Sequence, residues 1–341
     1  MRIAIVKLSA LGDIVHAMVA LQFIRREHPN IIIDWIVEER FAEILQYNPD
    51  ISQVLKVNLK ALKANKLAVF EELKKIRQYA NNHYDLVIDA QGLIKSAITA
   101  RLLGKKVAGF DKNSIREKVA AWFYDEKVAC AYDKNTIDRN ALVLSKPLGF
   151  NITSDQILDK KPFLYNDKPN PQLDEFFPKN RNTIIFVIGS TWESRNYPIA
   201  KFVNIAQNLS ADCLTLWGNE QEQAKADWMS KQCANIKVLP KLDLNDLKAI
   251  VGKADLVIGN DTGPTHFAWA LNKPSITIFG PTPISRVYQT DINKVIKSDS
   301  TVNPYKLNKA DYSINNIDEH EIINLANTLL SKQTDKILQL K

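Results

Sequence analysis

Residues 259–266, with the sequence GNDTGPTH, combine a carboxylate, hydroxyls and an imidazole around two glycines. They follow the apolar run ADLVI and lead into FAWALN, so they are expected to join a strand to a helix. Gly263 lets a ligand approach the backbone closely, and the free N–H groups and dipole of the helix start favour a diphosphate. The plainer interpretation is that Asp261 or Thr262 only caps the helix. Asp261, Thr262 and His266 together exceed what a cap requires.

Two further turns in the second half carry polar groups after apolar runs, and a third, GPT at 280–282, could repeat the anion-binding arrangement. Ser190 and Thr191 offer hydroxyls and Arg195 a cation, a combination that suits phosphate oxygens. Glu220 could accept hydrogen bonds from ribose hydroxyls. Each turn also has a plainer interpretation: a solvated loop, an exposed glutamate at a helix start, or a tight turn.

In the first half, the run RIAIVKL leads into SALGD, which places Asp13 at the start of a helix. A carboxylate there is stabilised by the helix dipole and stays ionised. If Asp13 faces a substrate cleft, it is suited to take a proton from an attacking hydroxyl. The alternative is that it serves only as a helix cap.

Positive residues gather in the first half. Four lysines recur at spacings of four, three and three, so any helical portion shows them on one face, and two arginines lie in later segments. Such a patch could hold an acidic acceptor or approach anionic lipid head groups, or it is simply a solvated face. Nucleic acid is disfavoured because no aromatic-interleaved basic motif accompanies the charge. The residues are Lys56, Lys60, Lys63, Lys66, Arg116 and Arg139.

The elements that position these residues alternate between short β-branched runs and helical patterns, which is typical of parallel βαβ units. Strands are expected at 2–8, 31–37, 84–90 and 105–110, and again at 183–189, 213–218, 254–259 and 275–280. Helices such as 14–27 and 66–80 lie between them, and an amphipathic helix begins near residue 317. Residues 162–182, rich in Pro, Asn and charge, are expected to connect two α/β halves. Two doubly wound halves place their binding loops at a cleft.

The 341 residues are enough for about two domains, and 45 Lys and Arg against 38 Asp and Glu give a net charge of +7. This composition excludes a small disulfide scaffold and a disordered chain. Three cysteines without a C-x-x-C pair indicate neither a disulfide framework nor a thiolate zinc site, and favour a reducing cytoplasm. A signal peptide and a membrane-spanning run are not expected. The dinucleotide, Walker A, G-x-S-x-G and H-E-x-x-H motifs do not occur.

Three segments, KLSALGDIVHAMVAL, YDLVIDAQGLIKSA and GNDTGPTHFAWALNKPSITIFGPT, closely resemble the ADP-heptose lipopolysaccharide heptosyltransferases of glycosyltransferase family 9. The resemblance implies the GT-B fold, with two Rossmann-like doubly wound domains facing across a cleft. Residues 1–165 would form the acceptor-binding domain, 166–182 a linker and 183–316 the ADP-heptose-binding domain. The carboxy-terminal helix, about 317–341, would pack back on the first domain.

The same resemblance implies an inverting transfer of heptose from ADP-heptose that uses neither a metal nor another cofactor. The segments DWIVEE and DAQGLIKSA are most similar to the members that use a hydroxyl of Kdo-lipid A as acceptor. A member that accepts on heptose, or a non-catalytic module that binds a nucleotide sugar, are the alternatives. A lipid-linked acceptor implies peripheral contact with the anionic cytoplasmic leaflet of the inner membrane, and no nucleic acid.

The resemblance also assigns roles to individual residues. Asp13 matches the catalytic base. Glu220 matches a ribose contact and Leu242 a residue beside adenine, while Arg195 stands where other members have lysine near the diphosphate. The positions that match the donor site are Ser9, Gly12, Ser190, Thr191, Arg195, Glu220, Leu242, Asp261, Thr262, Gly263 and His266. The cations that match positions for acceptor phosphates and carboxylates are Lys7, Lys60, Lys63, Arg116 and Arg139.

Overall fold

The computed structural model describes residues 1–59, 66–178 and 180–339, without the side chains of 66–68 and 333–339. The contacts divide the chain into two units, Met1–Tyr165 and Asn166–Lys341. This division falls where the first domain was expected to end. The expected linker at 166–182 is part of the second unit, since the backbone N–H groups of Asp167 and Asn170 donate to the side chains of Asn245 and Asp246.

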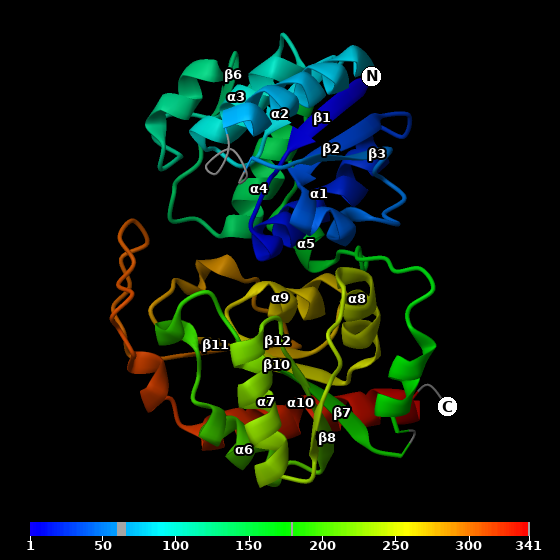
Figure 1. The fold of residues 1–341 in the computed structure, drawn as a ribbon, viewed down its shortest axis with the longest axis vertical. Helices are drawn as coiled ribbons and strands as arrows, with labels where there is room; N and C mark the ends of the chain where they lie inside the picture. Colours follow the sequence, from blue (N-terminus) through cyan, green and yellow to red (C-terminus); the bar gives the residue numbers. More distant parts are fainter. Residues whose placement is uncertain (60–65, 179, 340–341) are drawn as a thin grey trace. The chain divides into compact units, whose positions relative to one another are not determined.

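The first unit has a sheet of six described strands, all parallel, in the order β3-β2-β1-β4-β5-β6 (Figure 1). Its elements are β1 (Arg2–Val6), α1 (Leu11–Glu27), β2 (Ile32–Glu38), η1 (Glu39–Leu45), β3 (Gln53–Val57), α2 (Lys66–Tyr79), η3 (Ala80–Asn82), β4 (Leu86–Asp89), α3 (Ile94–Leu103), β5 (Val107–Phe110), η4 (Lys118–Phe123), β6 (Glu126–Val128), α4 (Thr136–Ser145), η5 (Lys146–Leu148) and α5 (Ser154–Leu158).

The second unit repeats this plan with the strand order β12-β11-β10-β7-β8-β9, again parallel throughout. Its elements are η6 (Pro171–Phe176), β7 (Asn182–Val187), η7 (Glu193–Arg195), α6 (Ile199–Gln207), β8 (Ala211–Leu216), α7 (Glu220–Gln232), β9 (Ile236–Val238), α8 (Leu244–Lys253), β10 (Leu256–Asn260), α9 (Gly263–Ala270), β11 (Ser275–Phe279), η8 (Ile284–Arg286), β12 (Asn293–Lys297), η9 (Ser313–Asn316) and α10 (Glu319–Gln339).

The order of the strands fixes where each unit can bind a ligand. In both sheets the chain starts at a central strand, β1 or β7, and later returns to pair on its other side with β4 or β10. The loops that leave these two adjacent strands run in opposite directions, which opens a crevice at their carboxyl ends. The loops after β1 and β4, and those after β7 and β10, are therefore the expected binding loops.

The eight expected strands form the inner four strands of each sheet, and the four strands that were missed, β3, β6, β9 and β12, are all edge strands. Inner strands such as RIAIV and TIIFV are buried on both faces and read as continuous apolar runs. Edge strands such as QVLKV and NKVIK carry lysine and half-exposed positions. Polar edge strands discourage pairing with other chains, and the same polarity weakens their sequence signal.

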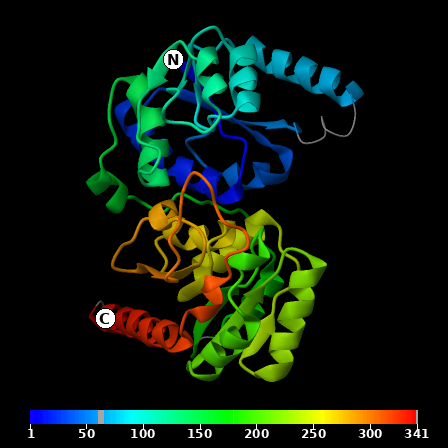
Figure 2. The same ribbon diagram turned by 90° about the vertical axis from the view of Figure 1, so that its left-hand side faces the viewer.

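The carboxy-terminal helix packs within the second unit. Its described side chains Ile322, Ala326 and Leu329 belong to the core of that unit, where α10 contacts α6, β10 and β11 (Figure 2). Asn204 and Lys201 on α6 bind the carboxylate of Glu319 at 2.9 and 3.2 Å. These side chains are therefore covered by the helix's own unit, and its expected packing on the first domain stays a prediction.

A pair of glycine variants tests the packing between β7 and β10. A Cβ on Gly259 would lie 2.5 Å from the Cβ of Val187 and 3.0 Å from its carbonyl oxygen, whereas one on Gly252 in α8 would meet nothing within 4 Å. We expect Gly259→Ala to lower the free energy of unfolding by about 1–3 kcal/mol because the strands must separate. Gly252→Ala should raise it by about 0.5–1 kcal/mol through helix propensity. Urea titrations of both variants measure the difference, and equal effects would contradict this packing.

Candidate active site at the two strand crossovers

Asp261 is the centre of the polar cluster that follows β10. Its carboxylate is buried, and Oδ2 accepts hydrogen bonds from Nη2 of Arg195 at 2.8 Å and from the hydroxyl of Thr282 at 2.9 Å. The same Arg195 nitrogen also donates to the carbonyl of Asp261. Nε2 of His266 lies 3.3 Å from Oδ1. The cluster therefore joins three loops, those after β7, β10 and β11.

Burial alone would raise the pKa of the Asp261 carboxyl. The hydrogen bond from His266 and the charges of Arg195 and Arg286 outweigh burial and lower that pKa well below its ordinary value. Asp261 is consequently a permanent anion that neutralises part of the positive charge around it. The Arg195 guanidinium carries five N–H groups, and those on Nη2 bind Asp261.

The interpretation of Asp261 and Thr262 as mere helix caps is wrong. Thr262 occupies the N-cap position of α9, yet its side chain makes no capping hydrogen bond, and the carboxylate of Asp261 binds Arg195 and Thr282 instead. Pro264 fills the first turn, where its missing N–H is not needed. The start of α9 is therefore left to other hydrogen-bond acceptors, as the anion-binding interpretation requires.

Asn260, which was not predicted as a site residue, fixes the loop after β7. Its side-chain nitrogen donates to the carbonyl of Ile188 at 2.7 Å, and its side-chain oxygen accepts from the N–H of Tyr197 at 2.9 Å. Asn260 is fully buried. The two ends of the loop after β7 are thus tied to the end of β10. The sequence could have indicated this role, because Asn260 is a side-chain amide next to Asp261.

The loop after β7 carries Ser190, Thr191 and Arg195, which the sequence analysis grouped together. Three of its buried oxygens, on Ser190, Ser194 and Asn196, have no hydrogen-bond partner among the described residues. Buried polar atoms are nearly always paired, so these oxygens indicate a segment whose partners include a bound ligand. Thr191 is exposed.

Glu220 lines an open hollow of about 540 Å³ at the ends of β8 and β9, together with Trp217, Gly218, Asn219, Gln221 and Lys241. Trp217 is fixed there because its indole nitrogen donates to the carbonyl of Leu239 at 2.7 Å. Leu242 follows Lys241 and is half-buried. The carboxylate of Glu222 accepts from the N–H of Gly218 at 2.7 Å, and a Cβ on Gly189 would overlap it. Glu222 thus links this hollow to the loop after β7, and sequence reasoning missed it.

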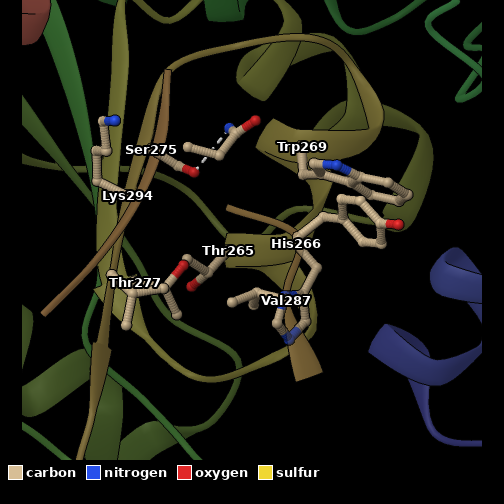
Figure 3. Close-up of a pocket in the computed structure, with 10 residues that line it drawn as sticks. Thr265, His266, Trp269, Ser275, Thr277, Val287 and Lys294 are labelled. Carbon is tan, nitrogen blue, oxygen red and sulfur yellow. Dashed lines mark hydrogen bonds between the residues drawn. The ribbon is translucent and has the colours of Figure 1, made fainter. Parts of the chain in front are cut away.

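A second, much smaller cavity lies behind α9, against β11 and β12 (Figure 3). Figure 3 shows Thr265 and Thr277 beside it, with His266, Trp269 and Val287 opposite. Its volume of about 10 Å³ corresponds to roughly one water molecule. A nucleotide cannot enter there, so the back of the helix that carries His266 is solid packing.

In the first unit, Asp13 is the third residue of α1 and half-buried. Its Oδ2 accepts the N–H of the N-cap residue Ala10 at 3.3 Å. The capping alternative is therefore correct in part, because the carboxylate does help to cap the helix. Ser9 and Gly12 flank this turn. The N–H of Ala10 fixes the position of the Asp13 carboxylate, and the dipole of α1 stabilises its negative charge.

Gln91, in the DAQGL segment, holds the loop that leads to Asp13. Its side-chain oxygen accepts hydrogen bonds from the N–H groups of Leu8 and Ser9, both at 3.1 Å. Gln91 is itself oriented by Asp89, whose carboxylate accepts from the N–H groups of Gln91 and Gly92. Gly92 has a φ of +70°, which favours glycine in this turn. Gln91 was not predicted as a site residue, although it lies in the DAQGLIKSA segment that carries the family resemblance.

Lys7 and Arg139 are turned inward. The Lys7 ammonium donates to the carbonyl of Ala90 at 2.8 Å and to the side chain of Asn140 at 3.1 Å, and burial lowers its pKa, although the charge of Asp13 acts in the opposite direction. The Arg139 guanidinium donates to three backbone carbonyls, those of Ser114, Cys130 and Ala131.

Arg116 is exposed, and its closest acidic partner is Glu117 at 3.9 Å. Lys60 and Lys63 lie outside the described residues. The contact of all five expected cations, Lys7, Lys60, Lys63, Arg116 and Arg139, with an acceptor stays a prediction.

No group of three or more His, Cys, Asp or Glu side chains is placed to hold a metal ion in the part of the chain that the structure describes. No helix within it is long and apolar enough to cross a membrane.

Comparison with known proteins identifies the family. The model of glycosyltransferase family 9 (heptosyltransferase) matches residues 73–311. The chain belongs to glycosyltransferase family 9. It is 36% identical to lipopolysaccharide heptosyltransferase 1 of Campylobacter coli over 98% of this chain and 100% of that protein. The family members are glycosyltransferases, and this chain is therefore a glycosyltransferase as the resemblance implied.

Solved structures of the family confirm the fold. E. coli heptosyltransferase WaaC with ADP matches with a TM-score of 0.80 and 25% identity, over 96% of this chain and 100% of that one. WaaC with ADP-2-deoxy-2-fluoro heptose matches with a TM-score of 0.74 and 26% identity, over 90% and 95% of the two chains. The two parallel α/β units are the Rossmann-like domains of the GT-B fold, which confirms the expected fold class.

The buried Asp261–Arg195 pair generates a prediction for stability and its pH dependence. Asp261→Asn leaves the Arg195 guanidinium buried without its carboxylate, so the free energy of unfolding of the second unit should fall by about 3–5 kcal/mol at pH 7. The pKa of Asp261 is lower when folded than unfolded, so its contribution is present above about pH 4 and is lost as the pH falls further. Urea titrations across acidic pH should therefore show a shallower slope for the variant.

The matched control is Asp174→Asn, which removes the acid of the exposed Asp174–Lys253 pair in the same unit. An exposed pair contributes little, so this change should cost less than about 1 kcal/mol. Equal losses of unfolding free energy in the two variants would show that Asp261 does not form a buried ion pair with Arg195.

A second prediction concerns Gln91. Gln91→Met keeps the size of the side chain but removes the acceptor shared by the N–H groups of Leu8 and Ser9. We expect these two amides to exchange hydrogen faster and the free energy of unfolding to fall by about 1–3 kcal/mol. Gln91→Glu keeps an acceptor oxygen and should retain the protection. Unchanged exchange in Gln91→Met, measured by mass spectrometry, would contradict the assigned clamp.

Proposed function

We propose that this chain is lipopolysaccharide heptosyltransferase I, which transfers L-glycero-D-manno-heptose from ADP-heptose to a Kdo hydroxyl of Kdo-lipid A. The transfer inverts the anomeric carbon and proceeds without a metal ion. The observation that carries this proposal is the polar cluster of Asp261, Arg195 and His266 at the start of α9, at a strand crossover. It stands in a chain that matches heptosyltransferase 1 of C. coli along nearly its whole length.

The diphosphate of the donor would lie at the start of α9. Thr262 and Gly263 begin this helix without a side-chain cap, so its N–H groups and dipole are available to phosphate oxygens. Ser190 and Thr191 would add hydroxyl donors from the loop after β7. Arg195, held at the start of α9 by Asp261, would place its positive charge near the diphosphate. The leaving group is then stabilised by groups already in position before the reaction.

The adenosine would occupy the open hollow that contains Glu220. A carboxylate is suited to accept hydrogen bonds from both ribose hydroxyls, and Trp217 supplies an aromatic wall. Leu242 would lie beside adenine. Asp261 and His266 would face the sugar side of the diphosphate, while Ser9 and Gly12 would contribute donor contacts from the first unit.

Asp13 would act as the general base. Its carboxylate takes the proton from the Kdo hydroxyl as that oxygen attacks the anomeric carbon, and the bonding electrons to the diphosphate leave with ADP. Attack opposite the leaving group inverts the configuration. Exposed Arg116, with Lys60 and Lys63, would bind the acidic groups of the acceptor. Lys7 and Arg139 would support this surface from within.

The protein would work at the cytoplasmic face of the inner membrane as a peripheral enzyme. The proposed acceptor is anchored in lipid, so the enzyme must meet it at a bilayer surface. The net charge of +7 favours an anionic leaflet. Nucleic acid is not proposed as a partner.

Asp13→Asn tests the central step. We expect release of ADP from ADP-heptose with Kdo-lipid A to fall about 10²- to 10⁴-fold, because the amide cannot accept the proton, while ADP binding is unchanged. The wild-type rate should survive a chelator. The control Asp155→Asn changes an exposed carboxylate in the first turn of another helix, α5, and should leave the rate unaltered.

The other outcomes separate the alternatives. Wild-type turnover only on a heptosylated acceptor would move the assignment to heptosyltransferase II. Tight binding of ADP-heptose without turnover on either acceptor would favour a non-catalytic binding module. Loss of the wild-type rate in chelator would contradict metal independence.

A further inference from the structure

Four apolar side chains of the first unit are exposed on two neighbouring helices. Ile94 and Ile98 on α3 are 39% and 41% exposed, and Val119 and Trp122 on η4 are 41% and 78% exposed. We refer to Ile94, Ile98, Val119 and Trp122 as the α3–η4 surface. None of these residues was singled out by the sequence analysis, and the site described above does not use them.

The geometry of the two helices places these side chains together. Ile94 and Ile98 are four residues apart in an α-helix and so share one face. Val119 and Trp122 are three residues apart in a 3₁₀ helix, where such positions are aligned. The two helices pack against each other, and the N–H of Ile94 donates to the carboxylate of Glu117, the residue before η4, at 2.8 Å. The exposed groups therefore form one surface and not scattered single residues.

The segment that carries this surface is rich in positive charge. Residues 94–122 contain seven Lys and Arg but only two acidic residues, which accounts for most of the net charge of the chain. Lys105, Lys106 and Lys118 are exposed, and none makes an ion pair among the described residues. Arg101 is paired with Asp125 at 3.0 Å. Lys118, which precedes Val119 in the chain, is thus available to an external anion, and so are Lys105 and Lys106 of the same segment.

We propose that the α3–η4 surface docks the protein on an anionic lipid bilayer, a conclusion that rests on the proposed function for its lipid-linked acceptor. An exposed tryptophan prefers the interface between head groups and acyl chains, and aliphatic neighbours insert with it. Lys118, which precedes Val119 in the chain, and the other exposed lysines of this segment then meet the phosphates of the lipid head groups. A protein partner does not require an exposed tryptophan in a segment that carries unpaired lysines. The charge complementarity assigns the surface to the bilayer.

The test measures partition of the full chain onto vesicles of phosphatidylcholine, with and without phosphatidylglycerol. Wild type should float with the anionic vesicles at low salt and be released at high salt. Trp122→Ser should weaken partition about tenfold through lost apolar insertion. Lys118→Gln should weaken it about fivefold through one lost cation. All these side chains are exposed, so the variants should fold.

The control variants lie on α7, which carries an exposed tryptophan among acidic residues. Trp228→Ser and Lys231→Gln remove the same chemical groups from this helix, and both should partition as wild type does. Equal losses in test and control variants, or no binding of wild type to anionic vesicles, would overturn the proposal. So would a dimer of the wild type that Trp122→Ser dissociates, because the surface would then bind a second copy of the chain.

A transfer assay separates this proposal from the proposed function. Trp122→Ser should transfer heptose normally to Kdo-lipid A dispersed in detergent and more slowly to the same acceptor in vesicles. Absence of transfer by the wild type in both forms contradicts the proposed function, while vesicle partition still decides the docking surface. Equal slowing in detergent and in vesicles would contradict a docking role.

Discussion

The site in each unit depends on one side-chain amide that bridges two parallel strands where the chain changes direction. In the second unit Asn260, at the end of β10, binds both ends of the loop after β7. In the first unit Gln91, after β4, binds two N–H groups of the loop after β1. Loops at the crossover have no strand partner for their own backbone groups, and an amide offers both a donor and an acceptor in one side chain. Because these clamps set the loop backbone, they determine where Asp13 and Arg195 can reach.

Asp261 adds electrostatics to the clamp in the second unit. A buried arginine beside a helix start would be unfavourable alone, since the helix dipole already places positive potential there. The Asp261 carboxylate offsets the charge of the arginine and the positive potential of the helix start. Its lowered pKa keeps it ionised. A diphosphate at this position would meet a cluster in which the carboxylate offsets only part of the positive charge. This arrangement suits a leaving group that must bind as a dianion and then depart with additional charge.

The sequence predicted the fold well where burial is complete and less well elsewhere. The eight inner strands read as apolar runs, whereas β3, β6, β9 and β12 at the sheet edges mix lysine with apolar residues and were missed. Asp261 and His266 were grouped because they belong to one segment, and the structure brings Arg195, from a separate motif, into contact with Asp261 because β7 and β10 are adjacent. Asn260 and Gln91 were missed because their roles depend on contacts with backbone groups far away in the sequence. Glu222 was missed because its packing against Gly189 is a tertiary contact. The packing of α10 on its own unit was likewise decided by tertiary contacts that an amphipathic pattern does not specify.

Positive charge serves two different purposes in this chain, and burial distinguishes them. Arg195, Lys7 and Arg139 are directed inward, where each donates to carbonyl, amide or carboxylate oxygens and fixes a loop. Lys105, Lys106 and Lys118 are exposed, and Lys118 precedes Val119 of the α3–η4 surface. The first group acts at short range and is little affected by salt, whereas the second acts over about a Debye length and is screened. A net charge of +7 therefore does not locate the surface that meets an anionic partner. The information lies in which cations the fold has left without an internal acceptor.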